Sequence, residues 1–137
     1  MPHRDIKNIP DETFIIEDGI LICRVILKRG KPYQHTCTLD TFRTVLWAGE
    51  DMAGTGFTIE EIVEAEDLPH TQVAVAFAFL HEYGCIEKRR RRNYATNGLL
   101  YEDGMIEFMY LRDYPATIDV HLDAMTEYHA LREKITG

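Results

Sequence analysis

Residues 58–94 read TIEEIVEAEDLPHTQVAVAFAFLHEYGCIEKRRRRNY, and this stretch decides the fold. Thr58 followed three residues later by Glu61 is the pattern of a helix N-terminus at which side chains and backbone cap each other. Pro69 suits the first turn of a second, apolar helix, where its missing N–H costs nothing. Gly84 is the residue expected just after that helix ends. We therefore expect two helices joined by a tight turn and followed by a strand that carries five consecutive cations.

The residues before this stretch predict antiparallel strands and one more helix. Asp18-Gly19 is a strong signal for a two-residue hairpin turn, and apolar or β-branched residues flank it on both sides. Two or three strands are therefore expected within residues 12–38. Thr38 is the expected N-cap of a helix over residues 39–51, whose apolar residues recur at helical spacing. Phe57 is expected to supply a very short strand.

The residues after the cations predict a returning strand and a final helix. Asn97-Gly98 and Asp103-Gly104 are turn dipeptides, so residues 105–111 are expected to form the strand that pairs with the basic one. An amphipathic helix is expected at residues 117–135. It either packs on its own domain or forms a dimer interface. Its candidate interface residues are Leu122 and Met125.

Composition indicates one compact domain. The chain has 137 residues, of which 45% are hydrophobic and 28% charged, as in ordinary globular proteins. No apolar run approaches the length of a membrane span, and the N-terminus lacks the apolar segment of a secretory signal. Three cysteines cannot all pair, which favours a reducing compartment, and we expect a cytoplasmic protein without a membrane partner.

Charge is distributed unevenly along the chain. The net charge is −8, yet residues 84–96 hold five cations against a single carboxylate, Glu87. Residues 40–83 hold nine acids and one base, Arg43. A DNA-binding domain is usually basic across its whole contact face. One small positive element on an acidic body predicts contact with nucleic acid through that element alone, or an acidic partner of another kind.

Residues 39–111 resemble a winged helix-turn-helix domain of the MarR-like and related bacterial regulator type. The resemblance rests on apolar residues at core positions of the second helix and on a glycine exit into the strand: Val73, Phe77, Leu80, Gly84 and Ile86. It implies an α+β fold in one domain. The strands at 12–38 are not part of that family's basic plan. Together with the elements predicted above, the resemblance gives a winged helix-turn-helix with an N-terminal antiparallel β-hairpin extension (residues 12–38) and a C-terminal amphipathic helix at 117–135 as the expected fold.

The resemblance implies that the exposed face of the second helix enters the major groove of double-stranded DNA. The positions expected on that face are His70, Thr71, Gln72, Ala74, Val75, Ala78 and Phe79. Gln72 can pair with adenine, and Thr71 or His70 can reach phosphate or base. However, the helix holds no Arg, Lys or Asn, and an apolar helix of this kind is usually covered. We favour a covered helix, packed on the N-terminal strands, the last helix or a second copy, with Val75 and Phe79 as interface residues.

The cations predict a projecting hairpin. In one continuous strand, alternate side chains would share a face: Lys88, Arg90 and Arg92 on one side, Arg89 and Arg91 on the other. Neither face of this part of the strand could then be buried, because each would carry charged side chains. Such a hairpin, which the resemblance identifies as the wing, suits phosphate contact or insertion into a minor groove. The alternative is a solvated ribbon neutralised by the acidic helix of residues 60–67.

Chemistry of other kinds has little support in the sequence. His35, Cys37, His81 and Cys85 are zinc-ligand types but lack zinc-site spacing, so no metal or cofactor is expected. No catalytic motif is visible, which predicts a non-enzymatic protein. Two functions remain. One is a small dimeric DNA-binding protein of the transcription-regulator kind. The other is a protein–protein interaction or dimerisation module that binds no DNA and whose partner is acidic.

Overall fold

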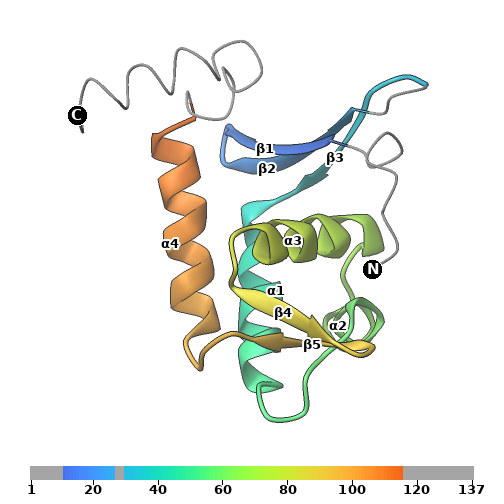
Figure 1. Cartoon of the computed structure of the whole chain (residues 1–137), viewed down its shortest axis with the longest axis vertical. Coiled ribbons are helices and arrows are strands. Elements are labelled where there is room, and N and C mark those ends of the chain that lie inside the picture. The colour runs from blue at the N-terminus through green and yellow to red at the C-terminus, as the bar shows by residue number, and fades with distance from the viewer. Residues whose placement is uncertain (1–10, 27–29, 116–137) are drawn as a thin grey trace, which may run out of the picture.

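The computed structural model describes residues 11–26 and 30–115 and shows an α+β fold. Its elements, in chain order, are β1 (Asp11–Glu17), β2 (Ile20–Ile26), β3 (Tyr33–Cys37), α1 (Leu39–Asp51), α2 (Ile59–Glu66), α3 (His70–Glu82), β4 (Ile86–Arg89), β5 (Arg92–Ala95) and α4 (Leu100–Asp113). In Figure 1 the three-stranded sheet lies above α3, the β4–β5 hairpin lies below it, and α4 runs down one side. No helix in the described ranges is long and apolar enough to cross a membrane.

The N-terminal sheet is antiparallel throughout, in the order β1-β2-β3. Asp18 and Gly19 form its first turn with φ of 53° and 75°, the left-handed conformations that a two-residue hairpin turn requires. This confirms the predicted turn and strands. Because side chains alternate along a strand, one face presents Phe14, Leu21 and Cys23 to the core, where all three are buried.

That face of the sheet covers α3 and explains why the helix is apolar. The ring of Phe79 is 0% exposed and meets the rings of Phe14 and Phe42 at centroid distances of 5.6 and 5.5 Å. Val75 is 4% exposed. The covered helix is thus confirmed, with the N-terminal strands as its cover. The expectation that Val75 and Phe79 lie exposed, ready for another molecule, is wrong, because the chain's own sheet buries them. The other two interface candidates, Leu122 and Met125, and the helix at 117–135 lie outside the described residues.

Helix boundaries follow the capping residues. The Thr38 hydroxyl accepts a hydrogen bond from the Thr41 N–H, and α1 begins at the next residue, as predicted. Thr58 and Glu61 form the predicted capping box at the start of α2. Gly84, with φ of 76°, follows the end of α3 and turns the chain into β4.

The returning strand of the basic hairpin lies earlier than expected. β4 pairs with β5 across a turn at Arg90-Arg91, so the cations do not form one continuous strand and the predicted alternation of their faces is wrong. The segment predicted as the returning strand, residues 105–111, is helical and belongs to α4. Gly104 is no turn residue: it lies inside α4 against the buried Leu46 of α1, and its missing side chain lets the two helices approach.

A basic hairpin as the candidate nucleic-acid interface

We use the name basic hairpin for residues 86–95, the strands β4 and β5 with their turn. Arg89 is paired with Arg92, and Lys88 with Asn93. Residues directly opposite each other in an antiparallel pair project on the same face. Ile86 and Asn93 lie on the face that is turned towards the core, where both are buried. Lys88, opposite Asn93, extends from the same face, and Arg89 and Arg92 project from the other face.

Arg92 fastens the hairpin to the body of the protein. Its Nε donates to the carbonyl oxygen of Thr55 at 3.0 Å, and its Nη2 donates to that of Gly56 at 2.9 Å. Nη2 also donates to Glu61 Oε1 at 2.7 Å. This hydrogen bond, together with the nearby positive charge, lowers the pKa of Glu61. The charge of Arg92 is thus neutralised by a carboxylate of the acidic helix α2, which is the alternative to phosphate contact.

Arg89 is held within the hairpin itself. Its guanidinium carbon lies 4.0 Å from the centre of the Tyr94 ring, within the range of a cation–π interaction. Its Nε lies 3.4 Å from a carboxylate oxygen of Glu87. The Tyr94 ring in turn lies over Gly56, where an added Cβ would approach the ring to 2.7 Å. Arg89 keeps its charge at the surface but in a fixed position.

The other three cations have no carboxylate of their own. Lys88, Arg90 and Arg91 are exposed, and none of their side chains forms an ion pair or hydrogen bond with any part of the chain that the structure describes. Arg90 has φ of 59° at the first turn position. Glycine is preferred there, and an L side chain in this conformation costs roughly 1–2 kcal/mol. The hairpin tip therefore presents three uncompensated positive charges in spite of this strain.

Asn93 is a positioning residue that the sequence did not reveal. It is 7% exposed; its Oδ1 accepts a hydrogen bond from His81 Nε2 at 2.6 Å, and its Nδ2 donates to the carbonyl oxygen of Phe57 at 3.4 Å. The backbones of Phe57 and Asn93 also exchange hydrogen bonds of 2.8 and 2.9 Å, so the predicted short strand at Phe57 exists as a bridge. The only sequence signal was a polar residue at an inward position of the strand.

The N-terminus of α3 is less open than expected. Gln72 Oε1 accepts from the backbone N–H and the hydroxyl of Thr38 at 3.0 and 3.2 Å, so this oxygen is already engaged within the chain. His70 is exposed, but its Nε2 lies 3.8 Å from a carboxylate oxygen of Glu60 on α2. Thr71 is exposed, followed by the half-buried Ala74 one turn later. The structure thus does not bring the α3 candidates and the hairpin cations into one positive surface.

The acids of α2 border this region. Glu60, Glu64 and Glu66 are exposed along the helix, and Asp67 ends it in a left-handed conformation with φ of 53°. Phosphate groups placed against this helix would meet like charges without compensation. In this region of the molecule, the exposed positive charge therefore lies on the hairpin and not on α2.

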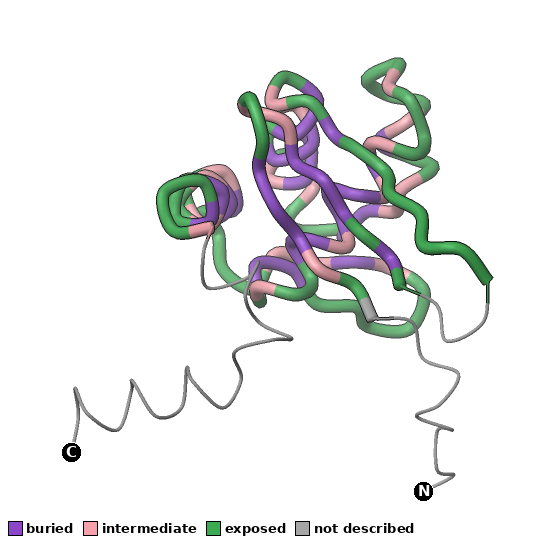
Figure 2. The backbone as a smooth tube through the Cα atoms, turned by 90° about the horizontal axis from the view of Figure 1, so that it is seen from above, coloured by how far each residue is buried: buried purple, intermediate pink, exposed green. Residues whose placement is uncertain are grey.

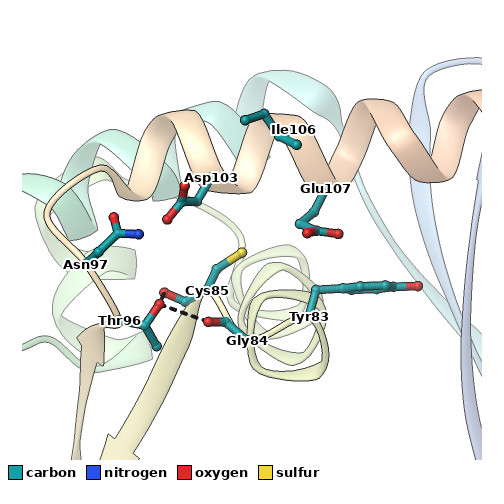
Figure 3. A pocket seen from close by; sticks show the side chains of 8 residues that line it. All are labelled: Tyr83, Gly84, Cys85, Thr96, Asn97, Asp103, Ile106 and Glu107. Atoms are coloured by element: carbon teal, nitrogen blue, oxygen red, sulfur yellow. Dashed lines mark hydrogen bonds between the residues drawn. The ribbon is translucent and has the colours of Figure 1, made fainter.

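A shallow pocket of about 220 Å³ lies on another side of the molecule, between α4 and the end of α3 (Figure 3). Thr96 Oγ1 hydrogen-bonds the carbonyl oxygens of Gly84 and Cys85 at 2.9 and 3.1 Å on its floor. Asp103 and Glu107 line it from α4. Burial, reinforced by these carboxylates, raises the pKa of Cys85 to about 11, so its thiol stays protonated at neutral pH. In the described ranges no cluster of three His, Cys, Asp or Glu residues is arranged to hold a metal ion.

Comparison of the chain with models of protein families, with curated proteins and with solved structures gave no match. Its function therefore has to be inferred from its own residues.

Proposed function

We propose that this chain is a non-enzymatic winged-helix module that binds double-stranded DNA through phosphate contacts of the basic hairpin. The order of its elements supports this assignment. Three helices, with a one-residue strand at Phe57 before the second, are followed directly by a two-stranded hairpin. That is the order in which a winged helix-turn-helix is built, and the hairpin takes the position of the wing.

The free cations at the tip carry the proposal. Lys88, Arg90 and Arg91 are exposed with no carboxylate of the described chain to neutralise them, although the protein as a whole is acidic. Arg90 stands where glycine would be less strained. Strain at a surface position is a reason to look for function, and a guanidinium is the side chain that binds phosphate in two-pronged fashion.

The same geometry implies that the protein contacts DNA with little recognition of individual bases. Sequence is read mainly by side chains that reach base edges, whereas phosphate contacts carry no sequence information directly. The α3 residues best suited to read bases are engaged or beside an acid: Gln72 by Thr38, His70 by Glu60. Binding should therefore be driven by charge, tolerant of sequence and strongly salt-dependent.

The test is a titration of a fluorescent random-sequence DNA duplex at about 50 and 200 mM salt, because removing one phosphate contact reduces the salt slope by about 0.9. The variant Arg90→Gln/Arg91→Gln removes the two guanidinium charges of the turn, keeps a polar side chain at each position and leaves Lys88 in place. The matched control, Arg24→Gln/Arg112→Gln, removes two exposed arginines that are paired with Glu17 and Asp113 away from the hairpin.

We expect the slope to fall by about two units in the tip variant and to change little in the control. An equal fall in both variants would mean that net charge, not the hairpin, governs binding. An unchanged slope in the tip variant would remove the hairpin from the mechanism.

A protein-interaction module is the second candidate, and the acidic α2 helix favours it. Its exposed carboxylates lie next to the region that a winged helix turns towards DNA. Under this alternative the hairpin binds an acidic protein surface. Absence of duplex binding even at the lower salt concentration would favour this candidate over DNA.

A further inference from the structure

The outer edge of β3 is open within the residues that the structure describes. β3 (Tyr33–Cys37) pairs with β2 on one side, and no described strand pairs with its other side. Figure 2 shows the strand in the colour of exposed residues until it reaches the buried Cys37. An edge of this kind carries a row of backbone donors and acceptors that are ready to pair with another chain.

The register identifies which backbone groups face outwards. Glu17 and Ile20 flank the two-residue turn and so form a hydrogen-bonded pair of β1 and β2. Hydrogen-bonded and non-bonded pairs alternate along an antiparallel ladder. Residues of β2 with even numbers therefore bond to β1, and those with odd numbers bond to β3. The partners of the odd set are Tyr33, His35 and Cys37, which leaves the N–H and C=O groups of Gln34 and Thr36 pointing away from the sheet.

The open edge has defined ends. Pro32, two residues before Gln34, has no N–H to offer. The N–H of Thr38, two residues after Thr36, already donates to the side chain of Gln72. Two donors and two acceptors thus remain, centred on His35.

Within Tyr33–Cys37, β3 carries none of the features that discourage pairing. Natural edge strands are usually protected by a charged residue, a proline or a bulge, but β3 reads YQHTC, with no acid, Lys, Arg, Pro or Gly. Its neighbours bring no carboxylate to the edge either: Lys31 and Pro32 precede it, and Arg24 of β2 lies opposite Gln34. β3 is a stretch along which two copies meet without opposing carboxylates. Tyr33 and His35 also hold their rings together on one face, with centroids 5.0 Å apart and both residues exposed.

We propose that a second copy of this chain pairs with this edge, β3 against β3, in a two-fold antiparallel arrangement centred on His35. Gln34 of each copy then lies opposite Thr36 of the other, and each such pair exchanges two backbone hydrogen bonds. All the outward groups of both edges are satisfied in this register, as a self-complementary interface requires. The ring pair of Tyr33 and His35 packs beside its counterpart on the same face. This inference rests on the sheet and is independent of the basic hairpin.

Amide hydrogen exchange measured by NMR at high and low protein concentration tests this pairing residue by residue. The amides of Tyr33 and His35 should be protected at both concentrations, because they bond to β2. Those of Gln34 and Thr36 should be protected only at high concentration, where sedimentation equilibrium should report twice the 15.9 kDa chain mass. The substitution Thr36→Pro removes one outward N–H without breaking the β2 ladder and should give a folded monomer. Thr36→Val keeps that N–H and should remain dimeric.

Three results would overturn the proposal. One is a chain that stays monomeric at every concentration reached. Another is a dimer in which Gln34 and Thr36 exchange freely, since its interface would lie elsewhere. The third is protection of these two amides in the dilute monomer, which would mean that the chain covers the edge itself. A circular dichroism spectrum of Thr36→Pro matching the wild type shows that loss of pairing is not loss of fold.

Discussion

Nη2 of Arg92 lies 2.7 Å from Oε1 of Glu61, and this contact joins the basic hairpin to the first turn of α2. The same carboxylate oxygen accepts the N–H of Thr58 at 3.0 Å as part of the capping box. One side chain therefore fixes both where α2 begins and where the hairpin lies. The hairpin and α2 are therefore coupled through it.

The Glu61 contact makes stability depend on pH. Its pKa is lowered from the ordinary value of 4.5, chiefly by the hydrogen bond from Arg92. A lowered carboxyl pKa gives stability that is present above pH 4.5 and is lost as pH falls through the lowered value. Glu61→Gln should therefore lower the thermal midpoint at neutral pH and make little difference in strong acid. Thermal unfolding from neutral to acidic pH checks this, with the exposed Glu64→Gln as control. A constant gap between wild type and Glu61→Gln would contradict it.

Substitutions of Arg90 and Arg91 form a matched pair that tests whether the backbone of the turn is strained. Arg90→Gly relieves a positive φ and should stabilise the fold by about 1 kcal/mol, whereas Arg91→Gly removes the same charge at a position without positive φ and should not stabilise it. Both should weaken DNA binding equally. Urea unfolding and the duplex titration measure the two effects separately. Destabilisation by Arg90→Gly would show that the arginine side chain itself supports the turn.

Phe79 tests the covering of α3 by the N-terminal sheet. Phe79→Ala should reduce the unfolding free energy by about 3–5 kcal/mol, because the ring is fully buried between Phe14 and Phe42. Trp47→Ala is the aromatic control: Trp47 is 50% exposed and only stacks on Tyr101, so about 1 kcal/mol is expected. Chemical denaturation measures both. A small effect at Phe79 would mean that the sheet does not hold the helix.

Gly104 tests the close approach of α4 to α1. A Cβ at this position would overlap the side chain of Leu46, which is fully buried and has little room to move. Gly104→Ala should therefore destabilise the protein by about 1 kcal/mol, although alanine is the better helix former. Gly54→Ala, where an added Cβ meets nothing, should change stability by less than about 0.5 kcal/mol. A more stable Gly104→Ala protein would show that the two helices lie further apart.

Local chemistry made much of this fold predictable from the sequence. Thr38, the Thr58–Glu61 pair and Gly84 mark helix ends because each satisfies backbone groups within a few residues of itself. Asp18-Gly19 fixes the first hairpin in the same local way, through the backbone angles that these residues tolerate. Periodicity of apolar residues was enough to place α1 and α3.

The tertiary structure alone decided where these elements meet. The Asp103-Gly104 dipeptide has the composition of a turn, yet packing of α4 on Leu46 makes Gly104 a helix residue. No local sequence pattern marks Arg90-Arg91 as a turn. The strand that follows it is held by the pairing of Asn93 with the distant Phe57 and with β4. Likewise Val75 and Phe79 are as apolar as interface residues would be, and only the sheet folded over them places them in the core. Each of these outcomes depends on partners far away in the chain, which no local pattern specifies.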